Sequence, residues 1–474
     1  MRQTWTCPAL LRGVGAGILL IGSTEMLAGC AAPAAAPAPV TGYGDLVPDP
    51  NGMLALPKDF RCTIVTQAGV TTLDSGEPTP RNHDGTGAFA RPGGGVVLVI
   101  NHEIGDPYGT ELPVPHHDGL TYDPGAAGGC TVITTDARGN RLGEIVGVAG
   151  TATNCAGGVT PWNTWLTCEE IDALAGTDGF WRDHGYVFEV DPFDPAANRD
   201  PQPILALGRF EHEAVAVDPR RGDKYLTEDA SNHNGLLYRW TPPTGWAAGK
   251  GALRRLGPTD GVLAAMRAVD GLGRHVPDLS LATAVGTSYA VEWVPVPDRD
   301  ARTAPIRNQF TDSDVTRARK VEGAWWGDGG AWIVSSYARE ESPVPHDGQV
   351  WFYDPASSRI TLRLLFARNL EPGVDGAYDG PDDIAVSPYG GVIIAEDGEG
   401  LQHLMGATPD GTTFPIARND STDATKDVEF TGPVFSPDRS LLFANIQEPG
   451  YMFAITGPWQ GGLGRAHPVR AVAG

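Results

Sequence analysis

A short run of the chain, residues 154–170 (NCAGGVTPWNTWLTCEE), combines two chemically different kinds of potential metal ligand. Cys155 lies in a Gly-rich turn, and Glu169 with Glu170 lies at the end of an expected strand. A thiolate is a soft ligand, a carboxylate is a hard one, and few histidines lie near them in sequence. The run therefore indicates a metal site of unusual composition, in which Cys155 suits iron or zinc better than calcium.

Acidic residues recur at comparable places along the rest of the chain, at or just after expected strands. A single Asp or Glu near a hairpin often only caps a turn, so the recurrence is what favours a functional interpretation. The candidate metal ligands are Glu103, Cys155, Glu169, Glu170, Glu213, Glu228, Asp229, Glu322, Asp382 and Glu396.

Short apolar segments bounded by Gly, Pro and Asp predict an all-β protein. We expect strands at residues 96–100, 185–190, 236–240, 331–335, 349–353, 391–395 and 440–444. A hairpin of one plan returns at residues 216–226, 384–394 and 434–443, which is typical of β-propeller blades. The alternative is a sandwich of unrelated hairpins. Residues 241–320 have the weakest pattern and predict an insertion, with a short helix within residues 252–284.

The innermost strands of a propeller converge on a central channel, so acids at equivalent blade positions would meet there. Many carboxylates in one funnel cannot all stay ionised unless cations neutralise them. We therefore expect a multinuclear metal site with calcium as the first candidate, because calcium tolerates many oxygen ligands in flexible geometry. The formal net charge of -23 argues against a nucleic-acid-binding surface, and it repels phosphate esters unless bound cations reverse the local field.

The N-terminal residues predict export rather than fold. Arg2 and Arg12 precede or flank a short apolar stretch, and residues 27–30 (LAGC) have the form of a bacterial lipobox ending at Cys30. We expect a lipoprotein signal peptide at residues 1–29, an Ala/Pro-rich tether at 30–45 and a single β-propeller domain at 46–474. The protein would be lipid-anchored through Cys30 to the outer face of the cell membrane, or secreted if the signal peptide is an ordinary cleaved one.

Four cysteines remain in the expected domain. An exported protein meets oxidising conditions, which permit disulfides. A Cys62–Cys130 disulfide and a Cys155–Cys168 disulfide are both compatible with the sequence, and spacing alone does not choose between them.

The run at residues 154–170 closely resembles the signature of the PhoX-type alkaline phosphatases. Further motifs that resemble the family occur in family order, among them NHE at 101–103, FEHEA at 210–214, PDD at 381–383 and AEDG at 395–398. The resemblance implies a six-bladed propeller with a calcium and iron (Ca²⁺, Fe³⁺) cluster in its channel, with Cys155 contributing to iron. It also implies an enzyme that hydrolyses phosphate esters.

The sequence departs from the family pattern at one charged position. The family has a phosphate-contacting arginine two residues before the equivalent of Glu322, where this chain has Lys320, with Arg319 one residue earlier. We expect Lys320, with Arg319, to stabilise charge on the transferred group, although a lysine cannot form the bidentate fork of an arginine.

The implied protein is a monomeric phosphatase acting on small phosphate esters. Two other functions remain open at this stage. One is a calcium-dependent lactonase or esterase, and the other is a non-catalytic propeller in which calcium only stabilises the fold.

Overall fold

The computed structural model describes residues 42–49, 52–231, 233–339, 342–374, 376–421 and 428–461. These residues all lie in one compact unit, Val40–Gly474, and residues 1–39 form a separate unit outside the described part. The signal peptide, the lipobox cysteine Cys30 and most of the tether expected from the sequence therefore lie outside the described residues. Among the described residues, no helix has the length and apolar character needed to cross a membrane.

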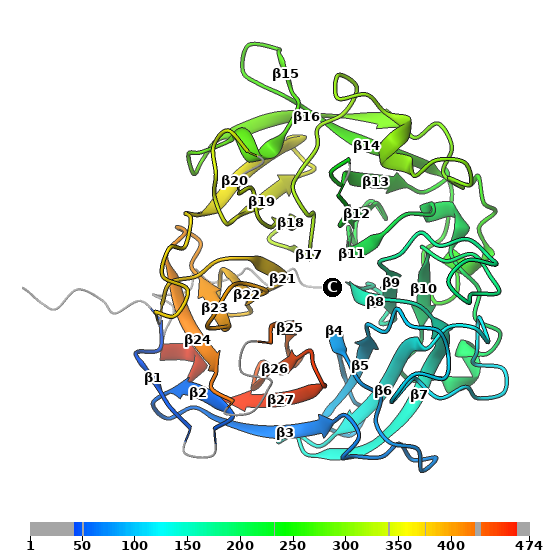
Figure 1. The fold of residues 1–474 in the computed structure, drawn as a ribbon, viewed down its shortest axis with the longest axis vertical. Coiled ribbons are helices and arrows are strands. Elements are labelled where there is room, and N and C mark those ends of the chain that lie inside the picture. Colours follow the sequence, from blue (N-terminus) through cyan, green and yellow to red (C-terminus); the bar gives the residue numbers. More distant parts are fainter. Residues whose placement is uncertain are drawn as a thin grey trace, which may run out of the picture. The chain divides into compact units, whose positions relative to one another are not determined.

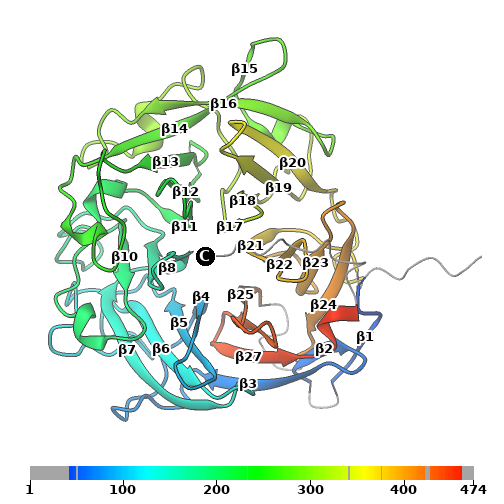
Figure 2. The same cartoon turned by 180° about the vertical axis from the view of Figure 1, so that it is seen from behind.

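The compact unit is built of antiparallel strands that run in meanders around a common centre (Figures 1 and 2). We name the meanders A to F in chain order. Meander A contains β4 (His83–Ala90), β5 (Val96–His102), β6 (Gly128–Thr135) and β7 (Arg141–Thr151). Meander B contains β8 (Asn154–Val159), β9 (Trp165–Glu169) and β10 (Val187–Val190). Meander C contains β11 (His212–Val217), β12 (Lys224–Glu228), β13 (Leu237–Thr241) and β14 (Val262–Val269).

The second half of the chain repeats this plan. Meander D contains β17 (Ala324–Gly327), β18 (Gly330–Ser335), β19 (Gly348–Asp354) and β20 (Arg359–Phe366). Meander E contains β21 (Pro381–Val386), β22 (Val392–Glu396), β23 (His403–Ala407) and β24 (Thr413–Asn419). Meander F contains β25 (Phe430–Phe435), β26 (Leu441–Ile446), β27 (Tyr451–Thr456) and, from the N-terminal side, β3 (Arg61–Gln67). The first strand of each meander, β4, β8, β11, β17, β21 or β25, lies nearest the centre in both views.

The expected all-β, propeller-like fold is confirmed, but the hydrogen bonds do not divide it into six separate sheets. Strand β16 (Ser288–Pro295) pairs with β14 on one side and with β20 on the other, so meanders C and D belong to one ten-stranded sheet. The structure therefore contains five sheets. The remaining short strands lie at the periphery and are β1 (Leu46–Val47), β2 (Leu54–Pro57) and β15 (His275–Val276).

Each of the three repeated hairpins expected from the sequence is an antiparallel strand pair, β11–β12, β21–β22 and β25–β26. The short helix expected within residues 252–284 is present only as two 3₁₀ turns, Leu253–Arg255 and Leu279–Leu281. That segment contains β14 and β15, and its only helical turns are of the 3₁₀ type. The Ala-rich β14 is a strand because it pairs on both edges, with β13 and with β16, and tertiary pairing outweighs local propensity. The 3₁₀ turns of the described chain are Pro195–Asn198, Leu205–Leu207, Leu253–Arg255, Leu279–Leu281, Ile306–Gln309 and Trp459–Gly461.

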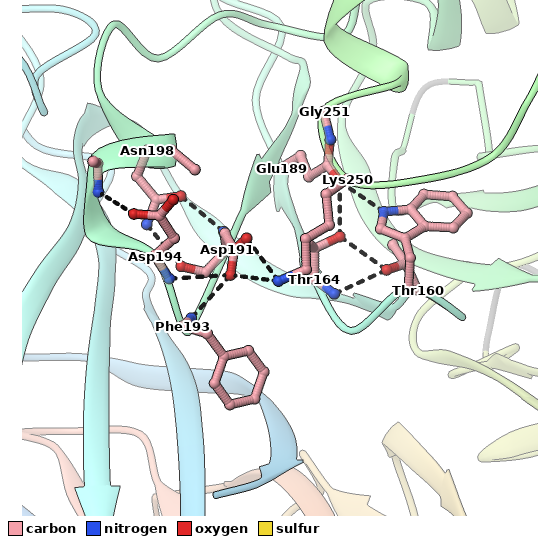
Figure 3. A network of polar contacts seen from close by, with 12 residues as sticks. Thr160, Thr164, Glu189, Asp191, Phe193, Asp194, Asn198, Lys250 and Gly251 are labelled. Carbon is pink, nitrogen blue, oxygen red and sulfur yellow. Dashed lines mark hydrogen bonds and ion pairs between the residues drawn. The ribbon is translucent and has the colours of Figure 1, made fainter. Parts of the chain in front are cut away.

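A buried polar network ties the expected insertion to meander B (Figure 3). Glu189 of β10 accepts hydrogen bonds from Trp162 Nε1 (2.7 Å), from Thr164 Oγ1 (2.8 Å) and from the backbone N–H of Gly251 (3.1 Å). Asp191 forms an ion pair of 2.8 Å with Lys250. The segment around residue 250 is therefore fixed to the turn at residues 160–164.

All four described cysteines are free thiols. Both disulfide pairings considered from the sequence are therefore wrong. Cys130, Cys155 and Cys168 are buried, and Cys130 instead donates a hydrogen bond to Asn101 Oδ1 (3.1 Å).

Candidate metal centre

The innermost hairpins share an irregularity that directs side chains to the centre. In five of the meanders the pairing of the first two strands skips two residues of the first strand, at His83/Thr86, Asn154/Gly157, His212/Val215, Pro381/Ile384 and Thr431/Val434. The first skipped residue is Asp84, Cys155, Glu213 or Asp382 in four of them. A β-bulge of this kind re-aims a side chain relative to its strand. In meander D, Glu322 lies two residues before β17, and its N–H donates to the Val334 carbonyl oxygen of β18.

A second set of acids comes from the ends of the second strands. Glu103, Glu170, Asp229 and Asp397 each follow directly after β5, β9, β12 or β22, and Gln447 follows β26. These strand-end residues are half-buried, whereas Asp84, Cys155, Glu213 and Glu322 are buried. Asp84, Cys155, Glu213 and Glu322 thus form the deeper part of the centre, whereas Asp382 and the strand-end residues, which are half-buried, form its more accessible part.

The two sets meet in three groups that could each hold a metal ion. The groups are Asp84 with Glu103 and Cys155, then Cys155 with Glu170 and Glu213, and then Glu213 with Glu322 and Asp382. Within each group, the ligand atoms lie within 4.8 Å of one another. Cys155 belongs to the first two groups and Glu213 to the last two, so the groups form one continuous centre.

Direct contacts link members of this centre. Cys155 Sγ lies 3.2 Å from Glu213 Oε1. Gln447 donates from Nε2 to Glu103 Oε2 (2.5 Å) and to Asp84 Oδ2 (3.1 Å). Lys320 Nζ lies 2.9 Å from Glu322 and 3.2 Å from Asp229.

The electrostatics of the centre require cations. Burial, reinforced by neighbouring acids, raises the pKa of Glu322 to about 8 and the pKa of Asp84 well above its usual range. Burial also raises the pKa of Glu103 to about 7. The pKa values of Glu213 and Asp382 are raised well above the ordinary range by the same two causes. So many carboxylates remain ionised together only where cations neutralise them.

The donor set fits bound metal ions on a second ground. Glu213 is 1% exposed, and its Oε2 atom has no hydrogen-bond partner within the described structure. Buried carboxylate oxygens are normally paired, and an unpaired one facing other acids is suited to a cation. The donors offer many oxygens and one sulfur, a combination that suits calcium together with a softer transition metal such as iron.

Three of the predicted ligands, Glu169, Glu228 and Glu396, do not enter this centre. Each is the last residue of a second strand, and successive strand residues point to opposite faces. Each is fully buried, and its carboxylate has its own donors. Glu169 accepts from the N–H groups of Ala152, Gly185 and Tyr186 and binds His184. We correct the prediction accordingly.

The other two carboxylates are satisfied in the same manner. Glu228 accepts from Tyr238 Oη (2.6 Å) and Leu236 N (3.2 Å) and pairs with Arg307. Glu396 accepts from the N–H groups of Asp379 (2.6 Å) and His403 (2.8 Å) and binds His403 Nδ1. These three glutamates therefore fix the loops that follow the strands and do not face a metal.

Lys320 and Arg319 separate in the same way. Lys320 has its ammonium at the centre, and its side chain is 37% exposed. Arg319 points elsewhere and binds Asp278 Oδ2 through Nε and Nη2. Of the two predicted catalytic cations, only Lys320 contacts the acids of the centre.

Asp84, Asp383, Asp397 and Glu429 lie at or beside the same acids but were not among the predicted ligands, although Asp383 and Asp397 belong to the PDD and AEDG motifs. Glu103, Asp383 and Glu429 are among the neighbouring acids whose charges raise the pKa of Asp84. A signal for Asp84 was present, because Asp84 is the second residue of the first strand of its hairpin, as Asp382 is in another hairpin. Glu429 lies directly before β25. Asp397 directly follows Glu396, and the two differ in the face of the strand to which their side chains point.

The opposite end of the centre is apolar. A cavity of about 520 Å³ is lined there by turn prolines and by residues that include Val217, Trp326, Val386 and Phe435. Trp325 lines this cavity and also the small space beside Gly85, Ala156 and Gly432, at the level of the bulges. Among the described residues, the acids of the centre therefore lie at the end of the inner strands opposite this cavity.

Comparison with known proteins agrees with this geometry. The structure of Pseudomonas fluorescens PhoX in complex with vanadate, a transition state analogue, matches with a TM-score of 0.65 and 20% identity, covering 90% of this chain and 100% of that chain. A gluconolactonase from Xanthomonas campestris matches more weakly, with a TM-score of 0.44 and 10% identity over 88% of this chain and 98% of its own. A search of curated protein sequences found no match.

The family profile described as alkaline phosphatase PhoX matches residues 41–450. The resemblance seen in the sequence motifs is confirmed by this match, and so is the expected enzyme class, a phosphoric ester hydrolase. The chain belongs to the alkaline phosphatase PhoX family.

Proposed function

We propose that the protein hydrolyses small phosphate esters at a multinuclear metal site built from Asp84, Glu103, Cys155, Glu170, Glu213, Glu322 and Asp382, with Asp229, Asp383, Asp397 and Glu429 completing its charge. The observation that carries the proposal is the chain of three metal-competent groups joined through Cys155 and Glu213. Calcium is proposed for the oxygen-rich part and iron for the part that includes Cys155. Bound cations would neutralise the carboxylates and polarise phosphoryl oxygens.

Lys320 is the residue we assign to the substrate. Its ammonium adjoins Asp229 and Glu322, and its side chain is partly exposed. Glu322 raises the pKa of Lys320 against the opposing effect of burial, so Lys320 stays protonated. A fixed positive charge at this place would bind a phosphoryl oxygen and stabilise the negative charge that develops during transfer. Arg319 is engaged by Asp278 and is not assigned a catalytic role.

We also propose that meanders A to F are the six blades of a propeller. The support is that each begins with a strand nearest the centre, and that β16 joins C to D only along their outer strands. Five of the six inner hairpins have a bulge at the equivalent place, which supports the interpretation of the meanders as repeats of one blade.

Export and anchoring remain proposals that rest on the sequence. The LAGC motif at residues 27–30 supports a lipoprotein attached through Cys30 outside the cell, followed by a tether and one catalytic domain at 46–474 acting as a monomer.

The decisive experiment is hydrolysis of p-nitrophenyl phosphate at alkaline pH by protein that begins after Cys30. We expect turnover with calcium and iron present, loss of turnover after chelation, and recovery when both metals return. Elemental analysis of the same sample distinguishes the alternatives, because calcium alone at one or two ions per chain would favour a lactonase-like enzyme. Folded, fully metallated protein without turnover would refute the proposal.

A further inference from the structure

We propose that Asn101 is a positioning residue that holds the Cys155 bulge in place and thereby directs the Cys155 thiol into the metal centre. Asn101 lies on β5 of meander A, whereas Cys155 lies on β8 of meander B. The inference rests on the proposed metal site and adds to it a residue that binds no metal itself.

The Asn101 side chain uses its whole hydrogen-bonding capacity in a buried position. It is 0% exposed. Its Nδ2 atom donates to the carbonyl oxygens of Cys155 (2.6 Å) and Ala156 (2.8 Å). Its Oδ1 atom accepts from Trp165 Nε1 (2.9 Å) and from Cys130 Sγ (3.1 Å). The amide orientation is therefore determined by partners on both sides.

The bulge needs such a partner because it leaves the β-ladder. Pairing between β8 and β9 passes from Asn154 with Glu169 directly to Gly157 with Thr167. Cys155 and Ala156 thus lie together opposite the single residue Cys168 and form no regular pair with β9, although both are buried. An unpaired buried carbonyl destabilises the fold, and here one amide group supplies donors to both carbonyls.

Meander A also holds the bulge by close contact. A Cβ atom on Gly85 would lie 2.7 Å from the Cys155 carbonyl oxygen and 2.6 Å from Ala156 Cα. Only glycine permits this approach. Gly85 and Asn101 therefore both contact the backbone of the Cys155 bulge, so the thiol direction depends on both.

A matching arrangement between meander F and meander A provides a control. Asn445 of β26 donates from Nδ2 to the Asp84 carbonyl oxygen (2.7 Å) and to Thr86 Oγ1 (3.0 Å). Asn445 lies two residues before Gln447, as Asn101 lies two residues before Glu103. Asn445 thus holds the bulge that presents Asp84, a carboxylate, and its Nδ2 hydrogen bonds go to that bulge and not to the Cys155 bulge.

The test uses Co²⁺ alone as the probe, because a thiolate bound to Co²⁺ gives a near-ultraviolet charge-transfer band that a carboxylate does not. Metal-free wild type, Cys155→Ser, Asn101→Asp, Asn101→Ala, Asn445→Asp and Cys130→Ala are titrated with Co²⁺, and folding is checked by circular dichroism. Asn101→Asp keeps the side-chain shape but turns a carboxylate oxygen toward two carbonyl oxygens. We expect it to lose most of the band and to bind Co²⁺ on the order of 10–100-fold more weakly.

The controls separate positioning from general damage. Asn445→Asp should retain the thiolate band, and Cys130→Ala, which removes one donor to Asn101 Oδ1, should weaken the band slightly. A wild-type band in Asn101→Asp and Asn101→Ala, or an equal loss in Asn445→Asp, would overturn the inference. If the Asn101 variants do not fold, an unchanged band in Cys130→Ala overturns it instead. Absence of the band in wild type would refute the Cys155 metal site and this inference together, a result distinct from loss of turnover alone.

Discussion

Two sets of acidic residues occupy neighbouring positions in the same strands and have opposite surroundings. Glu169, Glu228 and Glu396 end their strands, and each is surrounded by backbone N–H groups, histidine, tyrosine or arginine. Glu170, Asp229 and Asp397 follow by one residue and face other acids. Burial alone therefore does not make a metal site in this protein. What distinguishes the two sets is that backbone N–H groups donate to each carboxylate of the first set, whereas the second set lies among other acids and Asp229 is paired with Lys320.

The matched pair Glu170→Gln and Glu169→Gln tests this distinction most directly. We expect Glu170→Gln to reduce phosphatase activity at least on the order of a hundredfold with loss of bound metal, because it removes a group from the centre. Glu169→Gln should keep the metal but lower the free energy of unfolding by about 3 kcal/mol, since it breaks a buried pair with His184. Metal analysis and urea unfolding are the measurements. Equal effects of the two substitutions on metal content would contradict the comparison.

Substitution of the two adjacent cations extends the comparison to positive charge. Lys320→Ala should lower kcat on the order of a hundredfold, because it removes the charge nearest the proposed substrate position. Arg319→Ala should leave kcat nearly unchanged, because Arg319 binds Asp278 instead of the centre. Steady-state kinetics with p-nitrophenyl phosphate measure both. A larger effect from Arg319→Ala would reverse the assignment.

Metal removal should change how stability depends on pH. In metal-free protein the folded pKa values of Glu103 (about 7) and Glu322 (about 8) lie above the value of 4.5 for an unperturbed glutamate. Between these pKa values the folded protein binds more protons than the unfolded protein. The contribution of these two groups to stability is therefore greatest below about pH 4.5 and decreases as the pH rises to about 8. We expect the melting temperature of chelated protein to fall over this range, and calcium to abolish the fall. A chelated protein equally stable at pH 5 and pH 8 would show that the acids do not repel one another.

A buried lysine provides the smallest test. Lys224 is fully buried, lies over the rings of Trp240 and Trp246, and donates to the Gly222 carbonyl oxygen. Burial lowers the pKa of Lys224 to about 7. The unfolded chain binds this proton up to about pH 10.5, so this group makes stability increase as pH rises from 7 toward 10.5.

Lys224→Met should remove that increase while leaving metal content unchanged, because Lys224 has no contact with the centre. Differential melting of the two proteins between pH 7 and pH 10 measures the effect. If the stabilities of the two proteins had the same pH dependence, the folded-state pKa of Lys224 would not be lowered, and the aromatic rings would fully offset the cost of burying the ammonium.

Much of the fold could be predicted from the sequence because it depends on local patterns. Apolar segments bounded by Gly, Pro and Asp identified the strands, and recurring hairpins identified a propeller-like arrangement. The strand β14 was not among the predicted strands, because its strand state depends on partners on both edges, β13 and β16, which are distant in sequence. Likewise, cysteine spacing left two disulfides open, and neither pair is bonded in the folded chain.

The candidate site divides along the same line. The sequence by itself determined that acids recur at or near the ends of strands and that Cys155 accompanies them. It also determined that the chemistry of these side chains suits metal ions. The tertiary structure alone decided which acids face one another, because a strand alternates its faces with each residue and a bulge reverses that alternation locally. This is why Glu170 and Glu213 belong to the centre while Glu169 does not, and why Asp84 enters it from a hairpin more than 60 residues before Cys155.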